Sequence, residues 1–286
     1  MTPTAPPARY AVIGNPVSHS RSPAIHRLFA GQFAISLTYD TLPAPLDGFA
    51  DTVHTFFSHG GAGLNVTVPF KEQAYALARS HAGERAHLAG AANTLWMQDG
   101  FLHADNTDGA GLTNDLKRLG FDPRDKRILL VGAGGAARGV LFPLLAGQCR
   151  ELTVVNRTAQ RAHDLRRHCL DLLPNARQVL NAGALADAQG HYDIVINATS
   201  SSLGDTPPAL PTGLYNAQSL AYDMVYAAGD TPFMAQAREQ GAGHVADGLG
   251  MLVGQAAESF RIWHGVAPDT APVLTALREA LAAPQA

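Results

Sequence analysis

Short β-rich runs alternate with helical windows along most of this chain. Runs such as YAVIG (10–14), LTYDTL (37–42) and GLNVTV (63–68) are separated by stretches with apolar residues at helical spacing. Strands joined by crossover helices form parallel sheets with right-handed connections. The alternation therefore predicts an α/β fold.

A second group of such runs begins at KRILLVGAGG (126–135) and continues with ELTVVNRT (151–158), YDIVINATS (192–200) and LAYDMVY (220–226). Before it, NTLWMQDGFLHADN (93–106) predicts a hairpin that turns at Asp99-Gly100. Two helical windows, 248–265 and 270–283, end the chain. The proline-rich segment 201–218 predicts a loop. In the window 22–34 we expect Ser22 to cap the helix and Pro23 to open it.

Composition excludes several classes of function. The chain has 286 residues and a net charge of −3, which argues against nucleic acid as the main partner. No run reaches the roughly 18 consecutive apolar residues of a membrane span, and the first nine residues lack the apolar core of a signal peptide. Cys149, Cys169 and the 12 histidines show no ligand spacing, so we expect reduced thiols, no metal and a cytoplasmic protein.

The segment VGAGGAA predicts a dinucleotide site. Gly132, Gly134 and Ala137 give the pattern G-x-G-x-x-A, which follows an apolar strand (128–131) and opens a helix. The first glycine permits a tight turn, and the second lets the backbone approach a pyrophosphate. The N–H groups at the start of the helix then face the phosphates. The alternative is a glycine turn that only packs tightly.

The end of the next strand indicates which dinucleotide binds. An NAD site usually has an acidic residue there, bonded to the ribose 2′-hydroxyl. This chain has Asn156 instead, followed by Arg157, Thr158 and Arg161. A guanidinium binds a 2′-phosphate that a carboxylate would repel, so we expect NADP. The alternative is that the two arginines form a solvated helix face.

A lysine follows the buried-type run NVTVPFK (65–71) directly. Lys71 is either a surface charge at the start of a helix or an ammonium group held in a pocket, where it could donate a proton. Asp108, in NTDGAG, could orient such a lysine or simply cap the helix that it opens.

Eight motifs resemble those of shikimate dehydrogenases, in the same order. They are GNPVSHSRSPAIH, NVTVPFK, GAANTL, NTDGAG, VGAGGAARGV, NRT, INATS and DGLGMLVGQAAESFRIWHG. The resemblance covers nearly the whole chain, from about Tyr10 to Leu281. The resemblance implies a two-domain α/β fold: a Rossmann-type NADP-binding domain (108–247) and a discontinuous α/β substrate-binding domain (1–107 and 248–286).

The resemblance also implies roles for single residues. Lys71 and Asp108 match the family's catalytic pair. The matching substrate-binding residues are Ser20, Ser22, Asn65, Thr67, Asn93 and Gln255. The matching cofactor-binding residues are Gly132, Ala133, Gly134, Gly135, Ala136, Ala137, Asn156, Arg157, Thr158, Arg161, Thr199, Met224, Tyr226, Gly248 and Met251. Met251 has an alternative role as plain core material.

The implied activity is NADPH-dependent, reversible reduction of 3-dehydroshikimate to shikimate in aromatic amino-acid (chorismate) biosynthesis. Three alternatives stay open: an NAD(P)-dependent quinate/shikimate dehydrogenase, a paralogue that acts on a related ring acid, and a dinucleotide-binding paralogue without turnover. The expected ligands are NADP and a small-molecule substrate, with neither nucleic acid nor a membrane as partner. The chain is expected to be a monomer or a homodimer.

Overall fold

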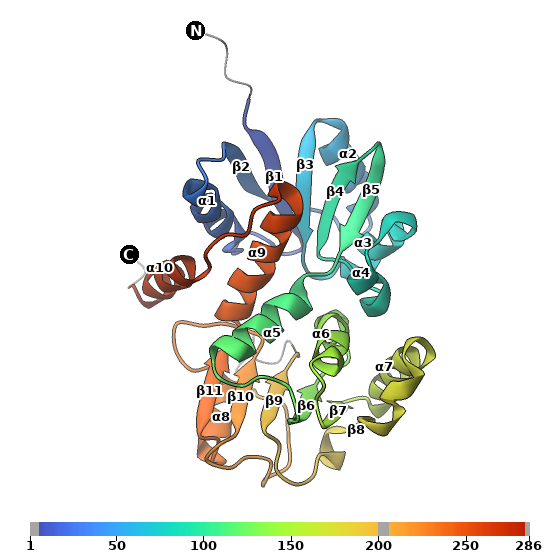
Figure 1. The fold of residues 1–286 in the computed structure, drawn as a ribbon, viewed down its shortest axis with the longest axis vertical. Helices are drawn as coiled ribbons and strands as arrows, with labels where there is room; N and C mark the ends of the chain where they lie inside the picture. The colour runs from blue at the N-terminus through green and yellow to red at the C-terminus, as the bar shows by residue number, and fades with distance from the viewer. Residues whose placement is uncertain (1–5, 200–205, 284–286) are drawn as a thin grey trace. The chain divides into compact units, whose positions relative to one another are not determined.

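A computed structural model describes residues 6–199 and 206–283 of the chain (Figure 1). Contacts between residues divide it into two compact units. Unit 1 comprises Met1–Thr107 and Gln255–Thr275, and unit 2 comprises Asp108–Gly254 and Ala276–Ala286. The sequence assigned all residues from 248 onward to the first domain, whereas by contacts residues 248–254 and 276–283 group with unit 2.

Unit 1 contains a five-stranded sheet in the order β2-β1-β3-β4-β5. The parallel strands are β1 (Ala8–Gly14), β2 (Leu37–Pro43) and β3 (Gly61–Val66). The antiparallel pair β4 (Thr94–Gln98) and β5 (Phe101–Asp105) forms the predicted hairpin. Its turn residues have positive φ angles, 52° at Asp99 and 81° at Gly100, as a two-residue type I′ turn requires.

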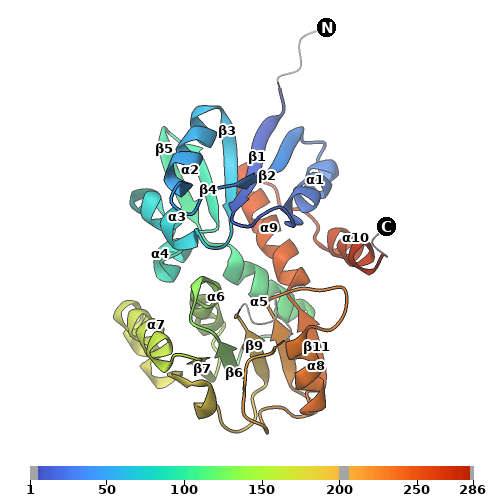
Figure 2. The ribbon, with the colours of Figure 1, turned by 180° about the vertical axis from the view of Figure 1, so that it is seen from behind.

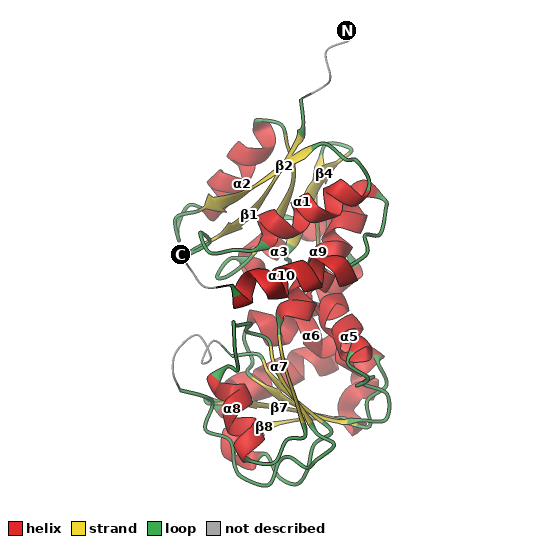
Figure 3. Cartoon of the chain, turned by 90° about the vertical axis from the view of Figure 1, so that its left-hand side faces the viewer, coloured by secondary structure: helices red, strands yellow, loops and turns green. Residues whose placement is uncertain are grey.

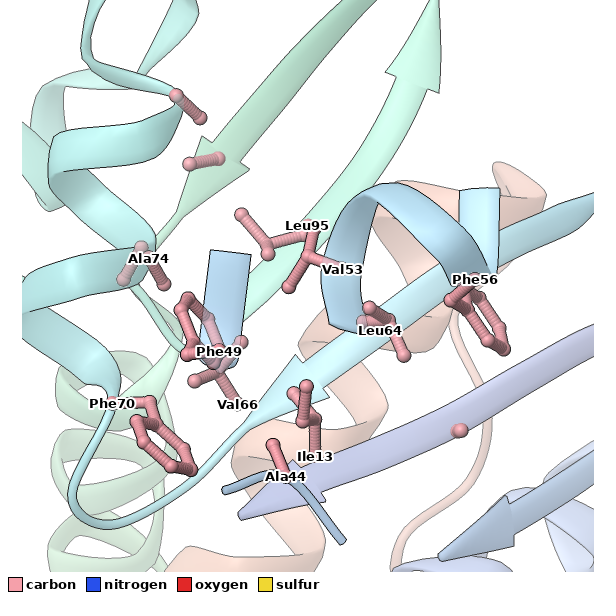
Figure 4. Close-up of a cluster of buried hydrophobic side chains, with 14 of the residues drawn as sticks. Ile13, Ala44, Phe49, Val53, Phe56, Leu64, Val66, Phe70, Ala74 and Leu95 are labelled. Carbon is pink, nitrogen blue, oxygen red and sulfur yellow. The ribbon is translucent and has the colours of Figure 1, made fainter. Parts of the chain in front are cut away.

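Alternate residues of the strands pack on opposite faces of this sheet, because successive side chains of a strand point to opposite sides. Ala11 and Ile13 join a cluster with α2 (Phe49–Ser58) and α3 (Lys71–Leu77), which Figure 4 shows in close-up. Tyr10 and Val12 lie on the other face, in a cluster with Tyr39 and with Trp263 of α9 (Leu249–His264).

Helices therefore cover both faces of the sheet in unit 1. Figure 1 shows α9 in front of the strands, and Figure 2, turned by 180°, brings α2 and α3 to the front. Helix α1 (Ser22–Gln32) packs on the α9 face, where His26 contacts Tyr39 and Trp263. The shorter α4 (Glu84–Ala89) precedes β4.

Unit 2 contains a six-stranded parallel sheet in the order β11-β10-β9-β6-β7-β8. The strands are β6 (Arg127–Val131), β7 (Glu151–Asn156), β8 (Leu180–Ala184), β9 (Ile194–Asn197), β10 (Leu220–Asp223) and β11 (His244–Asp247). Strand order reverses at β6, whose neighbours are β7 and β9. Ligands of doubly wound sheets bind at such a switch point, beyond the carboxyl ends of the strands.

The helices of unit 2 are α5 (Asp108–Arg118), α6 (Gly135–Ala146), α7 (Ala159–Leu172), α8 (Pro232–Glu239) and the end of α10 (Ala271–Ala282). Figure 3, coloured by secondary structure, shows helices around the strands of each unit. The two-domain α/β fold class is confirmed. Within residues 6–199 and 206–283, no helix is long and apolar enough to span a membrane.

Local predictions differ from the structure in two places, at Ser22 and at the end of the third strand. Ser22 does not cap α1: the helix starts at Ser22 itself, with Arg21 at the capping position and no side-chain cap. The third strand ends at Val66, and Val68-Pro69 is a cis peptide. The predicted loop 201–218 lies partly outside the described residues, and its described part, 206–218, contains no helix or strand.

Candidate substrate and cofactor sites

The substrate-binding candidates of unit 1 lie on or beside the sheet face that α1 and α9 cover. Asn65 stands next to Leu64 and Val66 in β3, and both of these neighbours point into the opposite cluster. The period of two along a strand therefore turns Asn65 toward α9. Its side chain is 4% exposed and donates from Nδ2 to Ser259 Oγ at 2.9 Å. Strand β3 thus presents the Asn65 amide to polar side chains on the α9 side of the sheet.

Asn93 is the centre of a buried hydrogen-bond network in this region. Its Oδ1 accepts from the Thr107 backbone N–H at 2.8 Å and from Thr94 Oγ1 at 2.9 Å. Its Nδ2 donates to Thr107 Oγ1 at 2.9 Å and to Gln255 Oε1 at 3.1 Å. The network therefore brings Asn93 together with Gln255, which follows it by 162 residues. Because buried amides need partners, these contacts fix the orientation of both side chains.

The same network reaches the predicted serines through a residue that the sequence did not single out. Tyr39 of β2 donates from its hydroxyl to Asn65 Oδ1 at 2.7 Å. The Ser22 hydroxyl lies close to the hydroxyl of Tyr39. Ser20 in turn donates to Ser22 Oγ at 3.2 Å. The structure therefore places Ser20, Ser22 and Asn65 around Tyr39 within unit 1.

Thr67 and Lys71 follow β3 directly. The Thr67 backbone N–H donates to Ile13 O at 2.9 Å, which extends the pairing with β1 beyond the end of β3. Lys71 is half-buried and is the first residue of α3. Its carbonyl oxygen accepts from the Ala92 N–H at 2.8 Å, so the start of α3 is tied to the segment before Asn93.

The predicted catalytic partner of Lys71 belongs to the other unit. Asp108 is a buried residue, and it begins α5 in unit 2. The pairing of Lys71 with Asp108 therefore stays a prediction.

Sequence reasoning missed four polar residues of the network: Tyr39, Thr94, Thr107 and Ser259. All four are buried. A buried hydroxyl needs a partner inside the protein. Ser259 carries the clearest signal in the sequence, because it lies one helical turn after Gln255 on α9. Tyr39, Thr94 and Thr107 stand next to other polar residues, so no contrast marks them.

In unit 2, Gly132 and Gly134 carry the geometry that the glycine pattern predicts. Gly132 has a φ angle of 115°, and a Cβ there would lie 3.1 Å from Ala198 O. A Cβ on Gly134 would meet nothing within 4 Å. Gly132 is thus required by the turn, whereas Gly134 keeps the start of α6 open to a ligand. Ala137 is fully buried in the helix–sheet packing, as expected for the third position.

The predicted phosphate clamp lies at the end of β7. Asn156 donates from Nδ2 to the Thr158 carbonyl at 3.0 Å, and Arg157 is exposed. Arg161 is also exposed, one turn into α7. Within the described residues, neither arginine takes part in an ion pair. Thr158 occupies the capping position of α7, but its side chain makes no cap hydrogen bond there.

The remaining cofactor candidates follow the carboxyl ends of β6, β9, β10 and β11. Thr199 donates from Oγ1 to Asn197 Oδ1 at 2.7 Å. Gly248 lies against Met224, because a Cβ on Gly248 would be 2.2 Å from Met224 O. Met224 and Tyr226 are half-buried, whereas Met251 is only 7% exposed. Ala133 is buried, and Gly135 and Ala136 lie half-buried at the start of α6.

These residues fit an NADP molecule. The N–H groups that open α6 suit a pyrophosphate, since a helix start carries partial positive charge. Two guanidinium groups at the end of the next strand suit a 2′-phosphate. A metal has no comparable site: among the described residues, no group of three or more His, Cys, Asp and Glu side chains could hold an ion.

Family models match three parts of the chain. The model of the shikimate dehydrogenase substrate-binding domain matches residues 12–95, that of shikimate/quinate 5-dehydrogenase matches 116–204, and that of the shikimate 5′-dehydrogenase C-terminal domain matches 248–278.

Individual proteins are similar over nearly the full chain. The chain is 59% identical to a shikimate dehydrogenase (NADP(+)) of Bordetella petrii, over 99% of both chains. It is 60% identical to that of Bordetella avium, over 96% of both. A crystal structure of shikimate 5-dehydrogenase from Thermus thermophilus in complex with NADP(H) and shikimate superposes with a TM-score of 0.84 at 33% identity, covering 96% of this chain and 100% of that one. With the same motifs, the same fold and these relatives, the chain belongs to the shikimate dehydrogenase family.

Proposed function

We propose that this protein catalyses the NADPH-dependent, reversible reduction of 3-dehydroshikimate to shikimate, in the cytoplasm, as a step of aromatic amino-acid (chorismate) biosynthesis. The observation that carries the proposal is the buried network around Asn93, which unit 1 builds next to the start of α3, where Lys71 stands. Amides and hydroxyls that are fixed in orientation suit a ring with several hydroxyl groups.

In this proposal, unit 1 binds the ring acid and unit 2 binds the dinucleotide. Ser20 and Ser22 hold the substrate carboxylate through their hydroxyl groups. Asn65, Asn93 and Gln255 each offer a donor and an acceptor to the ring hydroxyls, and Thr67 adds a further hydroxyl. Because the network already orients these side chains, little conformational freedom is lost when the ring binds.

Reduction of the ketone needs a hydride and a proton. NADPH supplies the hydride when it is bound. Lys71 supplies the proton to the carbonyl oxygen as an ammonium group, or stabilises the negative charge that develops there. Asp108 orients the amine. A positioned acid of this kind contributes roughly 10²- to 10⁴-fold to a rate.

Unit 2 selects NADP through Arg157 and Arg161. Both guanidinium groups are exposed at the place where an NAD site carries a carboxylate, so a bound 2′-phosphate gains charge-assisted hydrogen bonds. Asn156 ends β7 directly before Arg157, and Thr158 follows Arg157 at the start of α7. Gly132, Gly134 and the start of α6 receive the pyrophosphate, and Met224, Tyr226, Gly248 and Met251 line the nicotinamide end.

The test is a spectrophotometric assay of the purified protein with shikimate or quinate as substrate, and NADP or NAD as acceptor. The proposal predicts the highest kcat/KM for shikimate with NADP. Higher kcat/KM for quinate, or for NAD, would establish the quinate/shikimate alternative. NADP binding without turnover of either acid would establish a non-catalytic paralogue. Size-exclusion chromatography of the same sample distinguishes a monomer from a homodimer.

A further inference from the structure

Tyr39 is a buried tyrosine that the predicted chemistry does not use. It lies in the middle of β2 and is 2% exposed. Its neighbours on the sheet face include Tyr10, Val12 and Trp263, which form an apolar cluster. A phenylalanine would fill such an apolar space equally well, so the hydroxyl group calls for a separate explanation.

The Asn65 amide is held at both of its ends. Its Nδ2 donates to the Asn93 carbonyl at 3.1 Å and to Ser259 Oγ at 2.9 Å. A carbonyl oxygen can only accept, so the contact with Asn93 fixes which end of the amide faces it. The Oδ1 end then faces β2, where the Tyr39 hydroxyl donates to it at 2.7 Å and holds it in place.

The hydroxyl of Tyr39 also lies close to the segment with the two serines. Burial raises the pKa of Tyr39 well above its ordinary value, and the nearby Ser22 hydroxyl opposes that rise. Ser22 in turn accepts from Ser20 Oγ at 3.2 Å. The phenol therefore lies between Ser22, the first residue of α1, and Asn65 of β3.

Packing holds the phenol ring in place independently of its hydroxyl. The His26 ring of α1 stacks on it with a centroid distance of 4.3 Å and an angle of 8° between the planes. The Trp263 ring lies 6.5 Å away on the α9 side. Removal of the hydroxyl alone would leave these ring contacts in place, so the two roles of Tyr39 can be separated by experiment.

We propose that Tyr39 is a positioning residue: its hydroxyl holds Ser22 and Asn65 in the orientation in which they bind the ring acid. The inference rests on the proposed function, because it assigns a support to residues that bind the substrate there. It adds a residue that touches neither the substrate nor the cofactor and acts through Ser22 and Asn65.

The test is the variant Tyr39→Phe, assayed with shikimate and NADP. We expect KM for shikimate to rise about tenfold, which corresponds to about 1.4 kcal/mol, and KM for NADP to stay within about twofold of wild type. Tyr222→Phe is the matched control, because it removes an equally buried hydroxyl that donates to Asp115 Oδ2 at 2.8 Å in unit 2. This control is expected to lose stability without a change in KM for shikimate.

The possible outcomes separate the inference from the proposed function. Absence of wild-type turnover, or of shikimate binding by calorimetry, overturns the proposed function. An active wild type with an unchanged KM for shikimate in Tyr39→Phe overturns the inference, as does a fall in kcat alone. Should Tyr39→Phe not fold, Ser259→Ala applies the same test from the Nδ2 end of Asn65. It is expected to raise KM for shikimate, and an unchanged KM would contradict the positioning role.

Discussion

His26 is a fully buried histidine, and within the described part of the chain neither of its ring nitrogens has a hydrogen-bond partner. Burial lowers its pKa from 6.5 to about 3, and the nearby His264 adds to this shift. Asn65 opposes the shift but makes no hydrogen bond of normal geometry with the ring. The ring is therefore neutral in the folded protein at physiological pH.

Such a histidine makes stability fall in acid. Between pH 6.5 and 3 the unfolded chain binds a proton at this residue and the folded protein does not, so the free energy of unfolding falls as pH falls. The slope is about 1.4 kcal/mol per pH unit well below pH 6.5.

Urea titrations between pH 7 and pH 5 can measure this slope. Trp96 and Trp263 are the two tryptophans of the chain and both belong to unit 1, so their fluorescence reports its unfolding. We expect the slope to be smaller in His26→Leu than in wild type, and unchanged in the control His163→Leu, at an exposed histidine. Equal slopes in wild type and His26→Leu would show that His26 is protonated in the folded state.

Arg157 provides the second test at the scale of single residues. Its replacement by aspartate places a carboxylate where a 2′-phosphate is proposed to bind. The ratio of kcat/KM for NADP to that for NAD should fall about 10- to 100-fold, the range of one or two charge-assisted contacts. The control is Arg177→Asp, the same charge change at an exposed residue of unit 2. An unchanged ratio of kcat/KM for NADP to that for NAD in Arg157→Asp would show that Arg157 does not bind the 2′-phosphate.

The sequence identified the residue types of the site better than their contacts. The spacing of Asn65 and Asn93 within motifs was visible, yet their shared network with Thr107 and Ser259 was not. Those contacts join residues up to 194 positions apart. No local pattern specifies them, because they depend on how α9 packs on the sheet.

At the scale of elements, one buried carboxylate joins three segments of unit 2. Asp223, at the end of β10, accepts from Asn197 Nδ2 of β9 at 3.1 Å and from Thr231 Oγ1, which caps α8, at 2.6 Å. It also accepts from the Val225 N–H at 3.1 Å. Asn197 in turn binds Thr199. Asp223 therefore supports the loops with the cofactor candidates Thr199 and Met224.

Asp223→Asn should destabilise unit 2. An amide turns one acceptor into a donor, so at least one of the donors that face it loses its partner at a cost of about 1–3 kcal/mol. KM for NADP should also rise, because Asp223 supports the loops that carry Thr199 and Met224. Thermal unfolding and NADP kinetics provide the measurements.

The control is Asp230→Asn, which breaks a largely exposed ion pair with Arg238 and should cost less than about 1 kcal/mol. A loss of stability in Asp223→Asn no larger than in this control would contradict the role of Asp223.

The sequence predicted β6 and β7 but neither β8 nor β11. RILLV and ELTVVN, which became β6 and β7, stand out by their branched apolar residues. LNAGA and HVAD, which became β8 and β11, have almost none, and both strands are short. They are strands because β7 and β10 offer them an edge to pair with. That information is tertiary and is absent from a local window.

At the scale of the whole molecule, the sequence predicted two domains from the two groups of strands. By contacts between residues, α9 and α10 are each divided between the two units, because the division falls after Gly254 and after Thr275. Helical periodicity gives the length of a helix and its apolar face, but not the partner for each turn. The predicted boundary at 248 was placed at the start of the motif DGLGMLVGQAAESFRIWHG, whereas the boundary by contacts falls within α9.

The central claim for the whole molecule is that a proton from Lys71 accompanies the hydride. The most direct measurement compares turnover and shikimate binding in Lys71→Ala, with Lys117→Ala, at an exposed lysine of α5, as control. The account predicts that kcat falls roughly 10²- to 10⁴-fold in Lys71→Ala, while the Kd for shikimate by calorimetry changes by less than about tenfold. Turnover equal to that of wild type would contradict it.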